Sequence, residues 1–226
     1  ADAACKEGWR RRGSFGNLNI DEFQKVTGVS RETRDRLSHY AELLLRWNHA
    51  INLVANGSLR DLWNRHFLDS AQLLPLLPGQ EVGSGELVDL GSGAGFPGLV
   101  LAIMGAGHMH LIERDGRKCA FLREVAHKTV APVTVHNMDA AKIKPWPVKA
   151  VTARAFAPLP TLLPLAAPFI EQGALGLFLK GKTLDDELTQ SSKEWRITAD
   201  RVPSASDPAG CILRVRKLGH DHPKSD

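Results

Sequence analysis

The sequence has few cysteines and no long apolar segment. Its 226 residues include only Cys5, Cys119 and Cys211, which are odd in number and far apart, so they predict neither a disulfide framework nor a zinc knuckle. No apolar run approaches the ~18 residues that span a bilayer, and the N-terminal stretch ADAACKEGWRRRGSFG lacks the apolar centre of a signal peptide. We therefore expect a cytoplasmic protein with no membrane segment.

Metal-binding patterns are missing as well. His108 and His110 form one close pair and His220 and His222 another, but neither pair has further ligands at metal spacing. His66, in NRHFLDS, lies on an expected helix near Asp69, where a structural role is commoner than a catalytic one. The sequence predicts no metal site.

Composition indicates a globular protein with a slight excess of positive charge. With 43% hydrophobic residues and a formal net charge of +4, the chain can bury a sizeable core, and the charge favours a polyanionic partner such as nucleic acid without requiring one. We expect a flexible basic N-terminus over residues 1–17 and a helical extension over 18–80. A catalytic core over 81–217 and a polar tail over 218–226 complete the chain. The GWRRRG stretch fits either a basic arm on RNA or a disordered terminus.

Helical signals fill residues 18–79. One helix is predicted between a cap at Asn19 and a stop at Gly28, and a longer one starts from a cap at Ser30. The stretch SLRDLWNRHFLDSAQLLPLLPG predicts two more, the second capped by Asp69 or Ser70. We expect this segment to cover an edge of a sheet.

Short apolar runs alternating with helical stretches follow, which predicts a parallel sheet with crossovers. The helices are expected after Pro97, after Gly116, over 159–168 and over 183–193. The expected strands are ELVDL, MHLIE, PVTVH, KAVTAR and GALGLFLK. WRITADRV and CILRVRK have only the turn-rich PSASDPAG between them, which predicts a terminal antiparallel hairpin. The fold class is therefore α/β, a Rossmann-like doubly wound sheet with an N-terminal helical extension.

Two overlapping glycine patterns occupy the first strand-to-helix turn, LVDLGSGAGFPG. Gly93, Gly95 and Gly98 match G-x-G-x-x-G, which is typical of dinucleotide sites, whereas Asp89, Gly91, Gly93 and Gly95 form D-x-G-x-G-x-G. Pro97 fits the first helical position, and Gly98 allows close packing of the helix on the sheet.

Asp89 distinguishes the two ligands. A carboxylate there opposes the pyrophosphate of a dinucleotide and favours the ammonium and sulfonium of S-adenosylmethionine. We therefore predict the methyl donor as the cofactor.

Two acidic residues at later strand ends extend this predicted site. Glu113 ends the second strand, where a carboxylate accepts hydrogen bonds from ribose hydroxyls. Asp139 follows the third strand and is placed to contact an adenine edge, although a plain turn role fits it nearly as well.

Basic residues follow several of the expected strands, at the edge of the sheet where the cofactor site is predicted. Contacts to phosphate are one explanation, and solvated helix charges are an equally good one for Arg117 and Arg123. Arg154 and Lys180 are stronger candidates for the acceptor side because each ends an apolar run. The residues are Arg114, Arg117, Lys118, Arg123, Arg154, Lys180 and Lys182.

The methylated atom is constrained by what is missing. There is no Asn/Asp-Pro-Pro-Tyr stretch to hold an exocyclic amine and no Pro-Cys nucleophile to attack a pyrimidine. A ring nitrogen with a free lone pair, such as guanine N7, needs no general base, so positioning and electrostatics suffice.

Over about residues 40–183, the sequence closely resembles the ribosomal small subunit methyltransferase G family, also called glucose-inhibited division protein B. The segments that carry the resemblance are, in order, RWNHAINLVA, RHFLDS, VDLGSGAGFPGLVLAI, LIERDGRKCAFL, ARAFAPL and LFLKGK. The resemblance implies a class I methyltransferase that uses S-adenosylmethionine to methylate N7 of one guanine in bacterial 16S rRNA, with S-adenosylhomocysteine as product.

By the same resemblance, the cofactor-binding positions are Gly91, Phe96, the pair Asp139 and Ala140, and Arg154. Glu113 stands where relatives usually carry aspartate, and Ala140 where they often carry glutamate. We expect a monomer acting on 16S rRNA or the small ribosomal subunit. A nicotinamide oxidoreductase and a non-catalytic RNA-binding assembly factor remain the alternatives.

Overall fold

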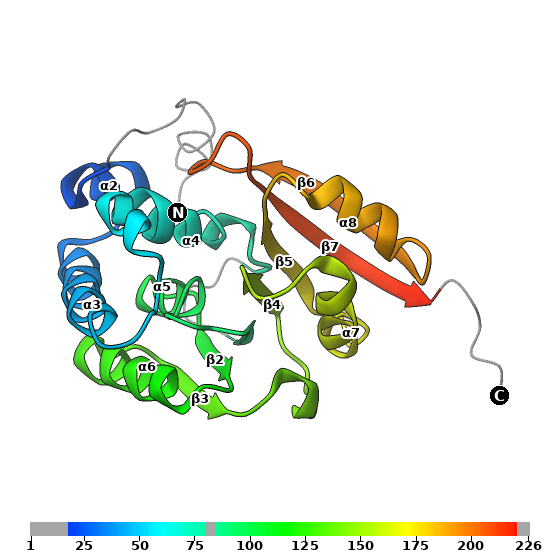
Figure 1. The fold of residues 1–226 in the computed structure, drawn as a ribbon, viewed down its shortest axis with the longest axis horizontal. Helices are drawn as coiled ribbons and strands as arrows, with labels where there is room; N and C mark the ends of the chain where they lie inside the picture. The colour runs from blue at the N-terminus through cyan, green and yellow to red at the C-terminus, as the bar shows by residue number, and fades with distance from the viewer. Residues whose placement is uncertain (1–17, 80–84, 221–226) are drawn as a thin grey trace.

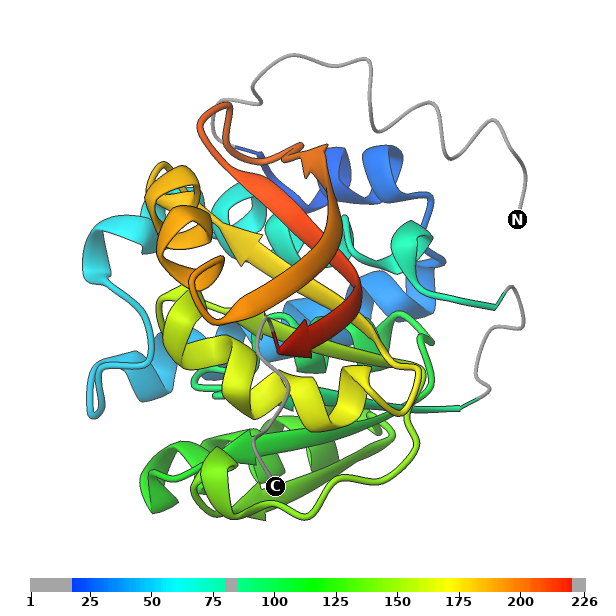
Figure 2. The same cartoon turned by 90° about the vertical axis from the view of Figure 1, so that its right-hand side faces the viewer.

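The centre of the molecule is a seven-stranded sheet with helices on both faces (Figures 1 and 2). The computed structural model describes residues 18–79 and 85–220. The strand order is β3-β2-β1-β4-β5-β7-β6. The strands are β1 (Glu86–Leu90), β2 (His108–Glu113), β3 (Val133–Asn137), β4 (Ala150–Arg154), β5 (Leu175–Lys180), β6 (Trp195–Pro203) and β7 (Cys211–His220). The first five are parallel, and β7 is antiparallel to both β5 and β6. The expected α/β fold with a terminal hairpin is confirmed.

The chain reverses its direction of winding at β1, which pairs with β2 on one side and β4 on the other. In open α/β sheets, ligands bind beyond the carboxyl ends of the strands at such a switch point. The end of β1 leads into the glycine-rich loop, so the fold brings the predicted cofactor loop to this position.

Four helices belong to this core: α5 (Gly98–Ile103), α6 (Gly116–Thr129), α7 (Leu159–Ile170) and α8 (Leu184–Ser191). Pro97 caps α5 instead of being its first residue, a difference of one position from the prediction. Gly98 does allow close packing, because a Cβ there would lie 2.4 Å from Leu111 Cδ2 and 2.9 Å from Asp89 Oδ2.

The N-terminal segment contains α2 (Ile20–Thr27), α3 (Arg31–Asn48), η1 (Asn56–Asp61), η2 (Trp63–Leu68), α4 (Asp69–Ala71) and η3 (Leu74–Leu76). The caps at Asn19, Gly28 and Ser30 are confirmed. A cap at Asp69 or Ser70 is wrong, because the backbone stays helical from Leu62 through Asp69 and η2 continues into α4. Asp69 is thereby free to make tertiary contacts.

The two faces of the sheet are covered by different parts of the chain. Leu87, Leu111 and Leu177 share a core with α5, α6 and the N-terminal helices, whereas α7 and α8 cover the face that includes Val88 and Phe178. In Figure 1, α2, α3 and α4 lie on the same side of the sheet as α5 and α6. The expectation that residues 18–78 cover an edge is therefore wrong. Both crossovers after β4 place their helices on the opposite face, so the N-terminal helices fill the space left above β5 and β7.

Three expectations fall partly or wholly on residues that the structure does not describe. GWRRRG and Cys5 lie outside the described residues, as does His222. Within residues 18–79 and 85–220, no helix is long and apolar enough to cross a membrane, and no group of three potential ligands for a metal ion occurs.

Candidate active site

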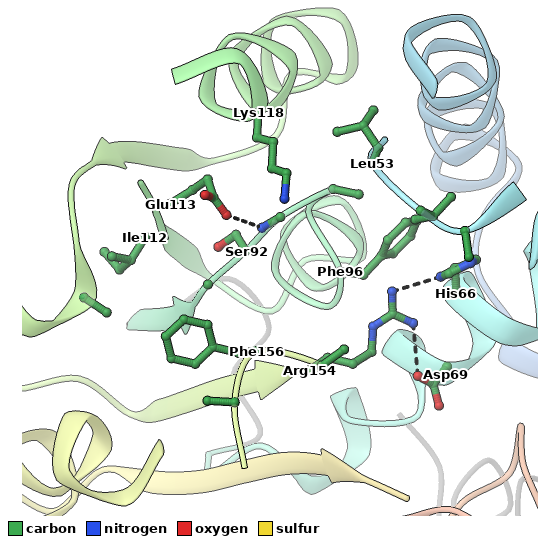
Figure 3. A pocket seen from close by; sticks show the side chains of 18 of the residues that line it. Leu53, His66, Asp69, Ser92, Phe96, Ile112, Glu113, Lys118, Arg154 and Phe156 are labelled. Atoms are coloured by element: carbon green, nitrogen blue, oxygen red, sulfur yellow. Dashed lines mark hydrogen bonds and ion pairs between the residues drawn. The ribbon is translucent and has the colours of Figure 1, made fainter. Parts of the chain in front are cut away.

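A pocket of about 1390 Å³ opens at the carboxyl ends of β1, β2 and β4. Its walls come from the glycine-rich loop, from the ends of β2 and β3, from the segment after β4, and from η1 and η2 of the N-terminal part. Ser206 and Asp207, in the β6–β7 loop, close one end. Figure 3 shows side chains from these separate elements pointing into the same space.

The glycine-rich loop forms one wall. Gly91, Gly93 and Phe96 line the pocket, whereas Gly95 does not. Gly95 faces the core instead, since a Cβ there would lie 2.4 Å from Leu99 Cδ1 and 2.8 Å from the Tyr40 hydroxyl. Gly95, which belongs to both glycine patterns of the predicted cofactor loop, therefore does not reach the pocket.

Asp89 lies behind this loop and is not part of the pocket wall. It is 1% exposed, and its Oδ1 accepts a hydrogen bond of 2.7 Å from the Thr152 hydroxyl. Burial raises the pKa of Asp89 to about 6, although the hydrogen bond from Thr152 acts in the opposite direction. That Asp89 offsets the positive charge of the cofactor stays a prediction, and the carboxylate would act from behind the loop, where α5 packs over it.

Glu113 ties the loop to β2. Its Oε2 accepts a hydrogen bond of 2.9 Å from the Gly93 N–H, and its Oε1 accepts one of 2.8 Å from the Asp115 N–H. Each carboxylate oxygen has a second lone pair, so Glu113 retains the capacity to accept two hydroxyl donors from the pocket. Lys118 on α6 lines the same region, and Figure 3 shows its side chain extending into the pocket beside Glu113.

Asp139 and Ala140 both line the pocket beyond β3. One carboxylate oxygen of Asp139 caps η4 (Ala140–Lys142) by accepting from the Ala141 N–H at 2.9 Å. Asp139 therefore has the predicted turn role and also lines the pocket. With Ile112, these residues form a half-apolar recess next to Glu113.

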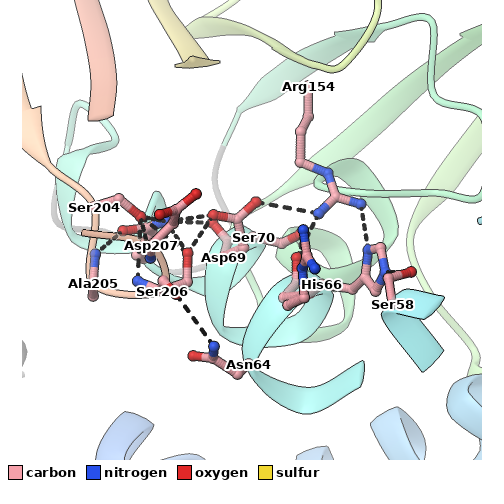
Figure 4. A network of polar contacts seen from close by, with 12 residues as sticks. Ser58, Asn64, His66, Asp69, Ser70, Arg154, Ser204, Ala205, Ser206 and Asp207 are labelled. Atoms are coloured by element: carbon pink, nitrogen blue, oxygen red, sulfur yellow. Dashed lines mark hydrogen bonds and ion pairs between the residues drawn. The ribbon is translucent and has the colours of Figure 1, made fainter. Parts of the chain in front are cut away.

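Arg154 is held at the end of β4 by a network from the N-terminal segment (Figure 4). Its Nη1 donates to the Arg65 carbonyl at 2.9 Å and to Asp69 Oδ2 at 3.2 Å, and its guanidinium lies 4.8 Å from the centre of the Phe96 ring. Asp69 Oδ1 in turn accepts from the Ser206 hydroxyl at 2.5 Å. Arg154 lines the pocket with a fixed orientation.

His66 is the third partner of Arg154, and its tautomer follows from the contacts. Arg154 Nη2 lies 2.9 Å from His66 Nδ1, and because a guanidinium only donates, Nδ1 must be the acceptor. His66 Nε2 then carries the proton and donates to the Ser58 hydroxyl at 2.7 Å, which donates to the Ala55 carbonyl. Burial, together with Arg154 and Arg65, lowers the pKa of His66 to about 3, so the ring is neutral.

Four of the predicted phosphate-binding residues are not in the pocket: Arg117, Arg123, Lys180 and Lys182. Arg117 is exposed beside Asp115, and Arg123 is exposed near the Val135 carbonyl. Lys182 is exposed on the surface. The Lys180 side chain is 8% exposed and bonds to the Ala157 carbonyl at 3.0 Å and to Glu187 Oε2 at 2.7 Å, so its placement on the acceptor side is wrong. Lys118, Arg114 and Arg154 do line the pocket.

The sequence interpretation missed several residues of the wall. Asp69 was expected to cap a helix, yet it contacts Arg154, whereas His66 has the structural role expected of it and holds Arg154 in place (Figure 3). Ser206 carried no local signal, because its importance comes from a contact with Asp69, 137 residues away in the chain. Phe156 stood in ARAFAPL as an aromatic residue two positions after the end of a strand, which is the signal that could have identified it.

The pocket wall has a slightly negative formal charge. The carboxylates of Asp61, Asp69, Glu113, Asp139 and Asp207 outnumber the cations of Arg65, Arg114, Lys118 and Arg154 by one, with His66 neutral. This surface suits a ligand of net charge +1 better than a dianion.

Two solved structures share this fold over most of the chain. One is a protein from Klebsiella pneumoniae assigned as an O-methyltransferase, with a TM-score of 0.54 and 14% identity over 87% of this chain and 94% of that chain. Another is the E81Q mutant of MtNAS in complex with S-adenosylmethionine, with a TM-score of 0.54 and 13% identity over 93% and 87%. The sheet order and the pocket at its switch point define a class I methyltransferase fold.

The chain belongs to the rRNA small subunit methyltransferase G (GidB) family, whose model matches residues 33–208. It is 56% identical over 201 residues to the ribosomal RNA small subunit methyltransferase G of Paramagnetospirillum magneticum, covering 89% of this chain and 97% of that protein. The protein of the same name from Rhodospirillum centenum is 56% identical over 202 residues, covering 89% and 92%. The expected family is confirmed.

Proposed function

We propose that this protein transfers a methyl group from S-adenosylmethionine to N7 of a guanine in 16S rRNA, as a monomer in the bacterial cytoplasm. The substrate class is supported by the names of the relatives. The donor is supported by the geometry of the pocket, and the acceptor atom by the family resemblance and by the chemistry that the wall can provide.

The main observation in favour of S-adenosylmethionine as the methyl donor is the hydrogen bond from the Gly93 N–H to Glu113 Oε2. A dinucleotide site uses loop N–H groups to hold a pyrophosphate, but here this N–H is already bound to a carboxylate, which would repel phosphate. S-adenosylmethionine has no phosphate, and its ammonium, sulfonium and carboxylate give a net charge of +1, opposite in sign to the pocket wall. The nicotinamide alternative is disfavoured on both grounds.

The residues of the pocket fit the cofactor in parts. Glu113 would accept the ribose hydroxyls, and the recess of Ile112, Asp139 and Ala140 would take the adenine. Gly93, where a Cβ would have no atom nearer than 3.8 Å, would allow the methionine part to approach the backbone. The sulfonium supplies an electrophilic methyl group when the cofactor is bound.

His66, the histidine of the pocket wall, is not free to act as a general base. The neutral His66 uses Nδ1 to accept from Arg154 and Nε2 to donate to Ser58, so neither nitrogen is available to remove a proton. Guanine N7 attacks with its own lone pair: the N7–CH₃ bond forms, the S–CH₃ bond breaks, and the positive charge passes from sulfur to the purine. The wall therefore only has to align the two partners and accommodate a cation.

The test is incubation with radiolabelled S-adenosylmethionine and small subunits, ribosomal-protein-bound rRNA or naked 16S rRNA from a strain lacking the modification. We expect label in one guanine, located by chain cleavage with borohydride and aniline, which act at 7-methylguanosine. If another base is labelled, or if none of the three substrates is labelled, the N7 assignment is wrong. If the protein binds NADH at equilibrium but does not bind S-adenosylmethionine, the oxidoreductase alternative is supported. If it fails to bind the methyl donor at all, the assembly-factor alternative is supported.

A further inference from the structure

Phe156 is an aromatic side chain that the structure leaves partly exposed at the pocket. It is 36% exposed and lines the pocket just after β4. Within residues 18–79 and 85–220, the other exposed large apolar side chains are Leu45 and Val130, and neither lines the pocket. No aromatic ring of the described part packs against Phe156, so one side of it is available to a ligand.

The ring lies against the glycine-rich loop. A Cβ on Gly91 would be 1.9 Å from Phe156 Cδ2 and 2.6 Å from Cε2, so only glycine at position 91 allows the ring to sit there. Figure 3 shows Phe156 next to Arg154, across the pocket from Glu113 and Lys118. The ring thus lies on the same wall as Arg154, a predicted acceptor-side residue.

The backbone that presents Phe156 is strained. Ala155 has a φ of +48°, a left-handed conformation that costs a residue with a Cβ about 1–2 kcal/mol. Such a conformation persists only where the surroundings enforce it, and it is concentrated at functional sites.

The surroundings enforce it from both sides. Arg154, which precedes Ala155, is fixed by Asp69, His66 and the Arg65 carbonyl. On the other side, Lys180 donates to the Ala157 carbonyl at 3.0 Å, and Glu187 accepts from the Leu159 N–H at 2.7 Å. Phe156 is thus held between two anchored positions.

We propose that Phe156 is the stacking surface for the purine that accepts the methyl group, and that Lys180 is a positioning residue that holds this surface in place. The inference rests on the proposed function and identifies what holds the acceptor. Bases are recognised in RNA by being turned out of the chain and stacked on aromatic side chains.

An aromatic ring suits this reaction for an electrostatic reason. The purine gains positive charge as the methyl group arrives, and the face of a phenyl ring attracts cations. Stacking on Phe156 is therefore stronger in the transition state than in the ground state, and an interaction of this kind raises kcat as well as affinity. The nearby Arg154 does not oppose the charge, because Asp69 is paired with it.

The experiment compares Phe156→Ala, Phe156→Leu and Phe156→Tyr in methylation of small subunits or 16S rRNA at saturating S-adenosylmethionine. Leucine keeps an apolar side chain beside Gly91 without a ring, and tyrosine keeps the ring. We expect kcat/KM for RNA to fall about 5- to 150-fold in the alanine and leucine variants, the equivalent of roughly 1–3 kcal/mol, and to stay within about threefold in the tyrosine variant. Part of the loss should appear in kcat.

Binding of S-adenosylmethionine, measured by calorimetry on the same variants, is the control. We expect its Kd to change less than about threefold. A loss of cofactor affinity equal to the loss of kcat/KM would instead assign Phe156 to the cofactor, and a leucine variant as active as the wild type would show that Phe156 only covers Gly91. Either result overturns the proposal. A wild-type protein that binds the cofactor but methylates no RNA would instead contradict the proposed function.

Discussion

Single residues in this protein have roles set by their surroundings more than by their type. Asp89 and Glu113 are both carboxylates at strand ends, yet α5 buries the first behind the loop while the second lines the pocket. Sequence could place both residues at the carboxyl edge of the sheet. It could not show which of them reaches the ligand, because that depends on where α5 packs.

Asp89 should make stability depend on pH. Its pKa is about 6 in the folded protein against an ordinary value of 3.8, so the folded state binds this proton more tightly. The free energy of unfolding should therefore fall as pH rises from about 4 to 6, by up to roughly 3 kcal/mol for a shift of about two units. We expect Asp89→Asn to lack this fall, so that its stability relative to the wild type increases between pH 4 and 7.

Urea unfolding at pH 4 to 8, followed by tryptophan fluorescence, measures this difference. Thr152→Val is the matched control. It removes a hydrogen bond that lowers the pKa of Asp89. In that variant the free energy of unfolding should therefore continue to fall up to a higher pH. A difference between wild type and Asp89→Asn that stays constant across this range would contradict the prediction.

At the scale of secondary structure, strands and long helices were predictable and short irregular helices were not. The caps at Asn19 and Ser30 have side-chain signals that act locally. The unbroken passage from η2 into α4 depends on tertiary contacts, such as those of Asn64 and Asp69 with the β6–β7 loop. A local pattern contains no information about these contacts.

The Lys180–Glu187 pair illustrates how two elements fix a third. Burial favours the neutral acid of Glu187, but hydrogen bonds from Lys180, Thr183 and Leu159 outweigh it and hold the pKa of Glu187 below its ordinary value. We expect Lys180→Met to lower the free energy of unfolding by about 2–4 kcal/mol, because it leaves a partly buried carboxylate without its cation. The double variant Lys180→Met/Glu187→Gln should recover part of this loss in urea unfolding.

The same variant distinguishes a positioning lysine from a phosphate contact. If Lys180 holds the segment of Phe156, Lys180→Met should reduce kcat while leaving the salt dependence of kcat/KM for RNA unchanged. If the slope of log kcat/KM against log salt concentration decreases by about one, a phosphate contact has been lost. That result would contradict the assigned position of Lys180.

At the scale of the whole molecule, the N-terminal helices and the sheet share one core. Phe23 on α2 is fully buried and contacts the rings of Trp63 and Phe67, and Phe67 contacts Phe96 in the glycine-rich loop. We expect parts that share a core in this way to unfold together.

Phe23→Ala should therefore destabilise the sheet as well as α2. We expect a loss of about 3–5 kcal/mol in the free energy of unfolding, as for other buried phenylalanines. Hydrogen exchange read by mass spectrometry should show the slowest amides of α3 and of β5 losing protection by the same factor. Loss of protection confined to residues 18–79 would show that this part unfolds independently.

The contact between Asp69 and Ser206 also affects when the site can form during synthesis. These residues are 137 positions apart in the chain, and β7, which follows Ser206, pairs directly with β5. A growing chain contains the whole glycine-rich loop long before it contains the residues that hold Asp69 against Arg154. Because long-range contacts of this kind form late, the acceptor end of the pocket is completed last, and an unfinished chain has a cofactor loop without an ordered place for a base.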